Sequence, residues 1–600
     1  VPPPWTPPAF SEDGTFRCWN RTVRLGGAGL VSSIVNKDRE MLTAPSTLVA
    51  DGLAMTFDVR CVEKKASEAT YLLSAREAPV AVRATCEFDG YIRFDATFPT
   101  SVTSLVWTVA ADRAGANGFD DCSSEKNANA YIPRGRDLSF DFNPDAVRRW
   151  WLPGTRGLMG GYLSLRGWHA RHLKKAGRVE ASEREIRVTT RFVDEPMTAG
   201  ADRTVSFYLE PTPVKPKNLA LAALDQSRVV TWTGHVFKHF ETKYPGFADP
   251  VRIKNYTDRI KRGDRVFWYN ATHGASPTDP FWGWYAADWN QRGLGYWARE
   301  APSATRKKAS WCYACPGSGS YRDFKVYAIN HALNEAIPEA KDLYCFWFER
   351  FYYVPIAAVR DIHKRAYRLV KRKNPDGCLK GHIAASMCPS DVFFDMITAC
   401  EGVAYDVLKN CFTYYDIFTP ELMRSFYVPR TQEYVFNAVP QLARARECWA
   451  PDLLRTYDPT CPEEERPIRH AAAYFKICDI VLSATPNDRR GPQFYTVDSA
   501  IRRLRQGGVY NAFYMDGQKP LVTLSSPGAR QLWAWFAKGR EGVLVLLNDT
   551  DASVRQTVSV VGVRTKGREI LSGRTYDFSS GDCVFDLGPR EACFVAFDRF

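Results

Sequence analysis

The sequence predicts a multidomain chain with an N-terminal antiparallel β-sandwich, a central (β/α)8 TIM-like barrel and a C-terminal β-sandwich. Three observations predict it. The 600 residues are too many for one ordinary hydrophobic core. Short runs of alternating apolar residues, separated by turn residues, occupy both ends of the chain. Between them, strand-like runs alternate with helix-like segments. The expected domains are residues 1–216, 217–507 and 508–600.

Composition and charge narrow the class of protein. Hydrophobic residues make up 45% and charged residues 24% of the chain, as in folded soluble proteins and unlike disordered ones. No apolar run is long enough to cross a membrane as a helix. The net charge of +13 is scattered in short clusters, so a solvated surface explains it better than a nucleic-acid interface. An anionic glycan as substrate remains an open alternative.

The N-terminal sandwich is predicted by period-two alternation in runs such as TFRCWNRTVRL, AMTFDVRCV, YIRFDATF and TVSFYLEP. The proline-rich PTPVKP at 211–216 then ends this region as a stiff linker. The first residues, VPPPWTPP, contain no initiator Met. We therefore expect a mature exported protein, secreted or periplasmic, whose signal peptide has been removed.

The central region alternates between strands and helices. Its basic amphipathic helix at 361–377 ends at Pro-Asp-Gly, a typical helix stop. This alternation predicts a (β/α)8 barrel, with a doubly wound sheet as the alternative, although no glycine-rich phosphate loop follows a strand. The other expected elements are strands at 266–274, 342–351, 378–386 and 392–402 and a helix at 321–336.

The C-terminal sandwich is predicted by GVLVLLNDT, ASVRQTVSVVGV, TYDFSS and CVFDLGPREACFVAFD. The 16 cysteines are too dilute for a disulfide-built scaffold. Those in apolar runs are expected to be buried thiols, namely Cys345, Cys400, Cys478 and Cys593.

Catalytic residues of a barrel lie at the carboxyl ends of its strands and in the loops that follow. Glycoside hydrolysis needs two carboxylates that flank the scissile bond. Asp395 is enclosed by apolar residues. Burying an unpaired carboxylate there costs free energy, so we expect Asp395 to have a partner or a function. The spacing of Asp395 and Glu401 does not reveal their distance in space. The strand-end rule selects Asn270, His273, Glu349, His382, Asp391, Asp395 and Glu401.

An aromatic segment, PFWGWYAADWN, supplies candidate sugar-stacking surfaces, because sugar rings stack on aromatic faces and an indole N–H binds hydroxyls. We expect it to be a loop that forms a binding wall, with core packing as the alternative. Its members are Trp282, Trp284, Tyr285 and Trp289.

These motifs resemble a bacterial family of glycoside hydrolase domain proteins with a sandwich, a barrel and a terminal sandwich. The resemblance covers most of the chain and includes GLVSSIVNKDREMLTAPSTL, WWLPGTRGLMGGYLSLRGW, YRLVKRKNPDGCLKGH, FFDMITACEG and YYDIFTPELMRSFY. It implies functional roles for Asp395, Glu401 and the strand-end His382. Where the family carries a Tyr-Asp motif at the end of the fourth strand, this chain reads LYCFWFERF, so either Glu349 replaces that aspartate or the acid is missing.

Together these observations predict a glycosidase that acts on a complex glycan. Glu401 is expected to be general acid or nucleophile, with Asp395 as its partner and Glu349 as a second acid. Substrate contacts are expected from His382, Asn270, His273, Asp391 and the aromatic segment. This chemistry requires no cofactor and no metal ion. The alternatives are a carbohydrate-binding protein on a degenerate barrel and a polysaccharide lyase. The sequence does not indicate the oligomeric state.

Overall fold

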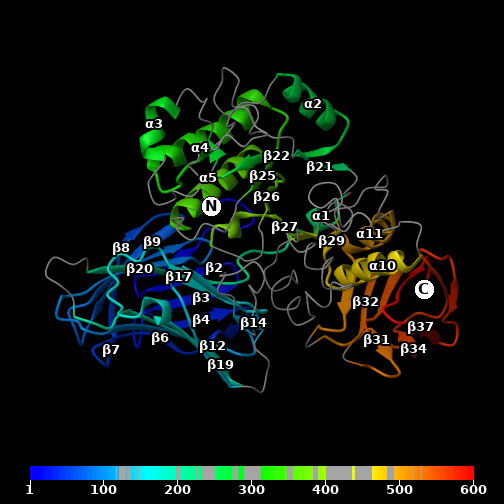
Figure 1. The fold of residues 1–600 in the computed structure, drawn as a ribbon, viewed down its shortest axis with the longest axis horizontal. Helices are drawn as coiled ribbons and strands as arrows, with labels where there is room; N and C mark the ends of the chain where they lie inside the picture. Colours follow the sequence, from blue (N-terminus) through cyan, green and yellow to red (C-terminus); the bar gives the residue numbers. More distant parts are fainter. Residues whose placement is uncertain are drawn as a thin grey trace.

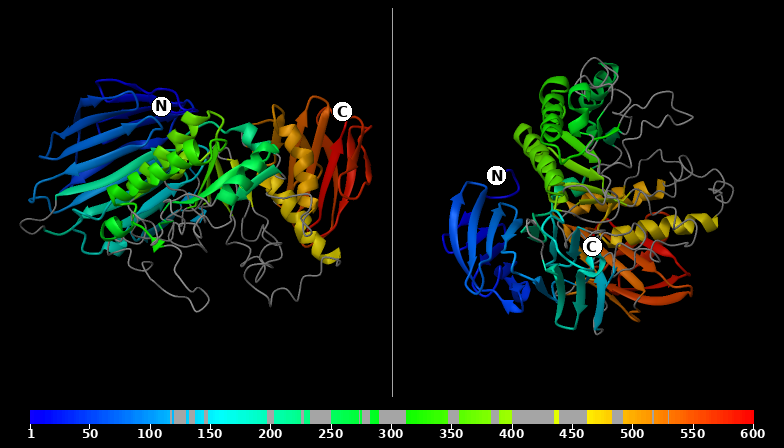
Figure 2. Two further views of the ribbon diagram at one scale, coloured as in Figure 1. Left: turned by 90° about the horizontal axis from the view of Figure 1, so that it is seen from above. Right: turned by 60° about the vertical axis from the view of Figure 1, so that its left-hand side comes forward.

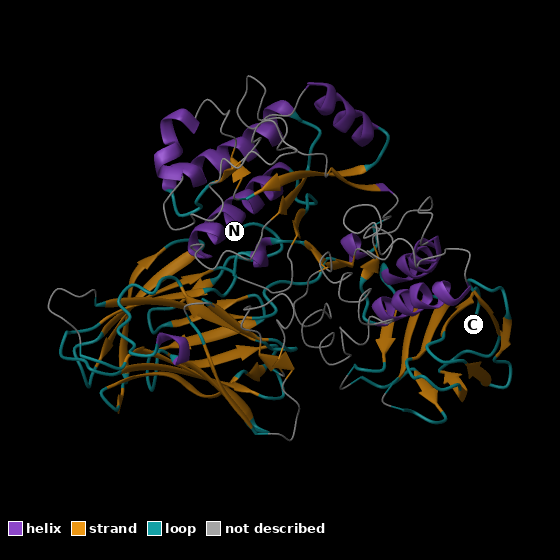
Figure 3. Cartoon of the chain, in the orientation of Figure 1, coloured by secondary structure: helices purple, strands orange, loops and turns teal. Residues whose placement is uncertain are grey.

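The fold was analysed in a computed structural model. The structure describes residues 1–116, 118–119, 130–131, 137–144, 148–196, 203–224, 228–232, 250–272, 274–275, 282–289, 312–346, 356–382, 389–399, 435–438, 462–482, 492–515, 518–528 and 530–600. Figure 1 shows two β-rich parts, blue to cyan and orange to red, with a third part, mainly green, that carries helices α2 to α5. Figure 3 shows that the helices gather in this third part and beside the C-terminal strands.

The N-terminal part consists of two antiparallel sheets that face each other across one apolar core. Alternating residues of each strand are buried, as the period-two pattern predicts. The first sheet has the order β1 (Ala9–Phe10), β2 (Thr15–Cys18), β3 (Arg21–Leu25), β4 (Val31–Asn36), β6 (Leu42–Ala50), β12 (Leu105–Asp112), β19 (Glu185–Val193), β18 (Gly177–Ala181) and β15 (Leu138–Phe142), with β5 (Arg39–Glu40) and β7 (Leu53–Ala54) beside it.

The second N-terminal sheet faces the helical part of the molecule, and its strands supply the contacts to helix α5 described below. Its order is β16 (Arg149–Leu152), β17 (Leu158–Tyr162), β20 (Thr204–Pro211), β11 (Ile92–Thr97), β10 (Ala81–Glu87), β9 (Glu68–Ala75) and β8 (Phe57–Lys64). A two-stranded sheet, β13 (Gly118–Phe119) with β14 (Ala130–Tyr131), and the short 3-10 helix η1 (Leu173–Lys175) complete this part.

Within its described residues, the central part has seven parallel strands that pair in the order of the sequence. They are β21 (Val229–Trp232), β22 (Arg265–Ala271), β25 (Asp342–Phe346), β26 (Leu379–His382), β27 (Met396–Ala399), β28 (Val435–Ala438) and β29 (Val481–Leu482). A doubly wound sheet reverses its strand order at a switch point. No reversal occurs among the described strands, which disfavours that alternative. No pairing closes β29 onto β21 in these parts of the chain.

Helices and short strands flank this parallel sheet. Ser318 caps α4, because its hydroxyl accepts a hydrogen bond from the Tyr321 amide at 3.2 Å. The flanking elements are α1 (Leu219–Ala222), α2 (Pro250–Lys261), β23 (Gly274–Ala275), α3 (Trp282–Trp289), β24 (Cys312–Tyr313), α4 (Gly319–His331), the π-helical turn η4 (Ala332–Ala336), α5 (Ile356–Lys373), the 3-10 turn η5 (Asp391–Phe393), α10 (Pro462–Ile477) and α11 (Pro492–Arg505).

Between β26 and β27 the described crossover holds the turn η5 where a barrel would carry a helix. The N-terminal part packs against this turn. Trp5 makes edge contacts with Phe88, Tyr367 and Phe393, at centroid distances of 5.2, 5.4 and 5.9 Å. The sandwich therefore shields a stretch of the parallel sheet, and the proline-rich start of the chain is part of the core.

Helix α5 is correspondingly less exposed than a barrel's outer helix. Its buried residues include Arg360, His363 and Lys371 as well as the apolar stripe. Arg360 binds Glu87 at 3.1 Å and Asp89 at 2.6 Å in the N-terminal sandwich. Lys364 also binds Glu87, at 2.9 Å, so two basic residues of α5 serve the contact between two parts of the molecule.

The C-terminal part is a sandwich of a six-stranded and a three-stranded antiparallel sheet around its own core. The larger has the order β30 (Val509–Ala512), β32 (Gln531–Lys538), β33 (Glu541–Asn548), β38 (Ala592–Phe597), β35 (Lys566–Glu569) and β36 (Thr575–Asp577). The smaller consists of β31 (Val522–Leu524), β34 (Val554–Val560) and β37 (Asp582–Leu587). Figure 2 shows this sandwich at the opposite side of the molecule from the N-terminal one.

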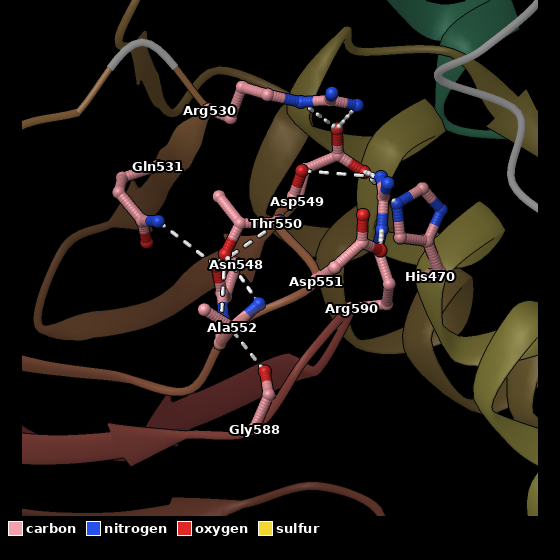
Figure 4. Close-up of polar contacts among 10 residues, drawn as sticks. All are labelled: His470, Arg530, Gln531, Asn548, Asp549, Thr550, Asp551, Ala552, Gly588 and Arg590. Atoms are coloured by element: carbon pink, nitrogen blue, oxygen red, sulfur yellow. Dashed lines mark hydrogen bonds and ion pairs between the residues drawn. The ribbon is translucent and has the colours of Figure 1, made fainter.

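Helices α10 and α11 join the C-terminal sandwich to the parallel sheet, since both contact β29 as well as β32 and β33. A buried carboxylate fixes α10. Asp549 accepts hydrogen bonds from Arg530 and Arg590 and lies 2.5 Å from His470 Nε2 of α10 (Figure 4). Three cationic or polar partners keep this fully buried carboxylate satisfied. The described free thiols Cys345, Cys478 and Cys593 are buried, as expected, whereas Cys400 lies outside the described residues.

Candidate active site

The carboxyl ends of the parallel strands meet at one edge, where the register aligns polar positions. His382 pairs with Phe346 of β25 and with Thr398 of β27. Thr398 in turn pairs with Asn437 of β28. Thr398 and Asn437 were not selected from the sequence, although a polar residue near the end of the short runs MITA and VFNA is a signal that could have found them. Three neighbouring strands therefore bring a polar residue to the same level.

The carboxylates expected at this edge follow the strands closely in the sequence. Glu401 is two positions beyond Ala399, the last residue of β27, and Glu349 is three positions beyond Phe346, the last residue of β25. Glu401, Glu349 and His273 lie outside the described residues. The placement of both glutamates at this edge therefore stays a prediction.

Asn270 lies near the end of β22 and is buried. The next described polar residue, Thr272, belongs to a buried chain of hydrogen bonds. Its Oγ1 lies 3.0 Å from His363 Nε2, and His363 Nδ1 lies 3.2 Å from the carbonyl oxygen of Ser390. Because a carbonyl only accepts, Nδ1 carries the proton and Nε2 accepts from the Thr272 hydroxyl. This chain fixes the backbone that follows β22 against α5.

Burial lowers the pKa of His363 to about 4. Desolvation is the main cause, because removing the imidazolium from water is unfavourable. The ring is therefore neutral at physiological pH, which matches its role as donor at one nitrogen and acceptor at the other. His363 is neutral and hydrogen-bonded at both ring nitrogens. It therefore positions Thr272 and does not serve as a general acid.

The aromatic segment forms helix α3, which corrects the expectation of a loop (Figure 1). Its residues divide between surface and core. Trp284 is 86% exposed and Tyr285 43% exposed, whereas Trp289 is 1% exposed. Tyr285 stacks on Trp289 at 5.6 Å and 9°. The side chain of Trp282 lies outside what the structure describes. The helix therefore offers the exposed ring of Trp284 and the ring of Tyr285, the latter stacked on the buried Trp289.

Hydrogen bonds hold α3 against α4. Trp289 Nε1 donates to Ser320 Oγ at 2.9 Å, and Ser318 Oγ donates to Asp288 Oδ2 at 2.6 Å. The Cys315 amide also donates to the Trp289 carbonyl at 2.8 Å. Because these contacts fix the end of α3, the exposed rings sit on a preorganised support, which lowers the entropic cost of binding a ligand there.

Asp395 occupies a different place from the one expected. The predicted strand at 392–402 begins only at Met396, so Asp395 lies at the amino end of β27, opposite the carboxyl edge. Its carboxylate lies 2.9 Å from Lys371 Nζ and accepts from the Leu379 amide at 3.0 Å and from the Tyr367 hydroxyl at 3.2 Å. The carboxylate that was predicted to need a partner therefore has several partners. These contacts connect α5 and β26 to the start of β27.

Asp391 lies in the turn η5, in the layer between α5 and the sheet. It is fully buried, and its Oδ1 accepts a hydrogen bond from Ser390 Oγ at 3.1 Å. Its backbone carbonyl accepts from the Phe394 amide at 2.9 Å. Its neighbour Ser390 is linked through His363 to Thr272, which follows β22, and a substrate contact from Asp391 stays a prediction. The sequence did not predict this short turn, because the apolar run Val392, Phe393 and Phe394 is typical of a strand.

Among the described residues, no cluster of three or more His, Cys, Asp or Glu side chains has the arrangement to hold a metal ion. Within the same parts of the chain, no helix combines the length and the apolar character needed to cross a membrane.

Several solved glycoside hydrolases align with this chain at low TM-scores. A GH36 alpha-galactosidase from Geobacillus stearothermophilus has a TM-score of 0.45 at 9% identity, with 99% of each chain covered. An alpha-galactosidase from Lactobacillus brevis has a TM-score of 0.44 at 9% identity, covering 99% of this chain and 98% of that one. An alpha-amylase from Geobacillus thermoleovorans complexed with acarbose has a TM-score of 0.41 at 11% identity, covering 63% and 90%.

No protein-family model and no curated protein matches the sequence at a significant level. The three solved chains belong to the class that the sequence resemblance indicates, glycoside hydrolases. Because every TM-score is below 0.5, these likenesses assign neither a substrate nor a catalytic residue to this chain.

Proposed function

We propose that the protein is a glycoside hydrolase whose active site lies at the carboxyl edge of the parallel sheet. One observation carries the proposal: β25, β26 and β27 are consecutive neighbours, and a glutamate follows the first and third within three residues of the strand end. Neighbouring strands lie about 4.8 Å apart, so the two strand ends are about 10 Å apart. Long glutamate side chains that converge from this distance span a scissile bond.

In this proposal, Glu401 and Glu349 form the carboxylate pair. One protonates the leaving oxygen, and the other attacks the anomeric carbon or activates a water molecule. Carboxyl separations of about 5 Å support retention and about 6.5 to 9.5 Å support inversion, and both are compatible with ends two strands apart. Asp395 is not a member of this pair, because its hydrogen-bond and ion-pair partners hold it at the opposite edge of the sheet.

His382, which ends the intervening strand, and Asn270 are proposed to bind substrate hydroxyls, and Trp284 and Tyr285 of α3 to stack on sugar rings. His273 is assigned to the same edge by its place in the sequence. The seven parallel strands in sequence order support closure into a (β/α)8 barrel, as the sequence predicts. The activity needs no metal ion or cofactor.

The decisive test is Glu401→Gln and Glu349→Gln, each assayed for reducing-sugar release from neutral and uronic-acid or sulfated glycans. Each substitution should lower kcat by at least about a hundredfold while glycan binding persists, because the amide keeps its size but loses the acid–base function. Glu339→Gln, an equal change at an exposed residue preceding β25, is the control. Wild-type binding without any release would instead favour a carbohydrate-binding protein, and an unsaturated product would favour a lyase.

A further inference from the structure

A cavity of about 280 Å³ lies at the amino edge of the parallel sheet, opposite the candidate active site. Three segments that are distant in the sequence enclose it: the first residues, the linker after β20, and α5 with the start of β27. Prolines form much of its wall, which fixes the backbone around it. The lining residues are Pro3, Pro4, Lys215, Pro216, Lys217, Asn218, Lys371, Pro375 and Asp395.

The lining is rich in ammonium groups. Lys371 Nζ donates to the Gly377 carbonyl at 2.6 Å and lies 2.9 Å from Asp395 Oδ2. The three N–H groups of the Lys371 ammonium therefore have two acceptors among the described residues. Lys215 Nζ donates to the Phe394 carbonyl and lies 3.6 Å from Asp395 Oδ1. Two buried lysines thus share one carboxylate.

The third lysine, Lys217, is paired with a carboxylate that a second cation also binds. Lys217 Nζ donates to Asp479 Oδ2 at 2.8 Å. Arg505 binds both oxygens of Asp479, at 2.7 and 2.6 Å. The side chain of Lys217 is 9% exposed, so solvent screens its charge poorly. Among the described residues that line the cavity, three are lysines and one is an aspartate.

The surroundings of Lys215 are consistent with this excess. The pKa of Lys215 is lowered to about 8, because burial, together with the nearby Lys371 ammonium, outweighs the opposing effect of Asp395. A second anionic group beside Lys215 would offset both effects.

We propose that this cavity binds a small oxyanion, a phosphate or sulfate group, either free or carried by a small sugar. Lysine ammonium groups bind phosphate oxygens as point charges through charge-assisted hydrogen bonds. Lys215, Lys217 and Lys371 approach the cavity from two segments, so a bound oxyanion links the linker to α5. The cavity volume accommodates such a group together with a small organic substituent.

The test is calorimetric titration of the full chain with inorganic phosphate, with thermal unfolding measured in phosphate and in chloride of equal ionic strength. Phosphate should give a saturable heat and raise the Tm by at least about 2 °C over chloride, because a ligand that binds only the folded state stabilises it. The absence of a saturable heat, or equal stabilisation by chloride, would overturn the proposal. No glycan turnover is measured, so this result is independent of the proposed hydrolase.

A matched pair of variants locates the site. Lys217→Gln removes one ammonium group while Arg505 keeps Asp479 paired, and it should weaken phosphate binding about tenfold. Lys254→Gln makes the same change at an exposed lysine paired with Asp258 and should leave the Kd within about twofold of wild type. Equal Kd values for the two variants would place the anion elsewhere and refute the assignment. Comparing inorganic phosphate with glucose 6-phosphate then distinguishes a free anion from a sugar-borne one by the lower Kd.

Discussion

At the scale of single residues, the surroundings of His363 give it a role that is visible in the pH dependence of stability. Its folded-state pKa is about 4 against a usual value of 6.5. Between these pH values the unfolded chain binds the proton and the folded protein does not. The stability that the neutral ring contributes is therefore present above pH 6.5 and is lost as the pH falls toward 4.

The prediction is that His363→Gln reduces this acid-induced loss of stability. The amide can supply one donor and one acceptor to Ser390 and Thr272, but it does not titrate. The linked contribution amounts to about 3 kcal/mol at most. The free energy of unfolding, measured with urea at pH 7 and pH 4.5, should fall by less in the variant than in wild type. His172→Gln, at an exposed histidine, should retain the wild-type pH dependence; identical profiles for all three proteins would contradict the assignment.

At the scale of elements, the crossover between β26 and β27 depends on a close contact with a strand. Gly381 of β26 lies beneath the ring of Phe394, which follows η5, and a Cβ at Gly381 would approach that ring to 2.2 Å. The absence of a side chain therefore allows the turn to pack on the strand, which brings Phe393 to Trp5 and Asp395 to Lys371.

We predict that Gly381→Ala lowers the free energy of unfolding by about 1 to 3 kcal/mol, because the added methyl group overpacks a buried contact. Gly319→Ala is the control, since a Cβ there meets no heavy atom closer than 4.0 Å and the residue lies in the first turn of α4. It should be neutral or stabilising by up to about 1 kcal/mol. Chemical denaturation of both variants tests the contrast, and an equal loss in the two would refute the role of Gly381.

At the scale of the whole molecule, sequence patterns predicted local structure better than the junctions between parts. The helix expected at 361–377 is α5, and the strand expected at 378–386 begins at Leu379, because both depend on local periodicity. The position of His382 at a strand end follows from the same pattern. Asp395 could not be placed this way, since its position depends on a turn whose apolar residues pack on distant Trp5 and Phe88. The role of VPPPW was missed for the same reason.

The junction between the N-terminal sandwich and α5 is held by charges that are buried together. Arg360, with a 3% exposed side chain, binds Glu87 and Asp89 and lies 3.7 Å from Glu210 Oε1. It also donates to the Pro389 carbonyl at 2.6 Å, beside η5. Burial raises the pKa of Glu210 well above its usual value, and Arg360 opposes this shift. One guanidinium therefore satisfies groups from both parts.

Arg360→Met should destabilise the folded protein by about 3 to 5 kcal/mol, since it removes the guanidinium from the buried carboxylates of Asp89 and Glu210. Arg365→Met, on the same helix, removes a partly exposed guanidinium that pairs with Asp323 and Asp361 and should change stability by less than about 1 kcal/mol. Urea unfolding followed by tryptophan fluorescence compares the two variants, with wild type as reference. Because Arg360 joins the sandwich to α5, its loss should also allow the N-terminal part to separate first, seen as a broadened or two-step transition. A single sharp transition with wild-type stability would show that apolar contacts such as Trp5 with Tyr367 suffice to hold the two parts together.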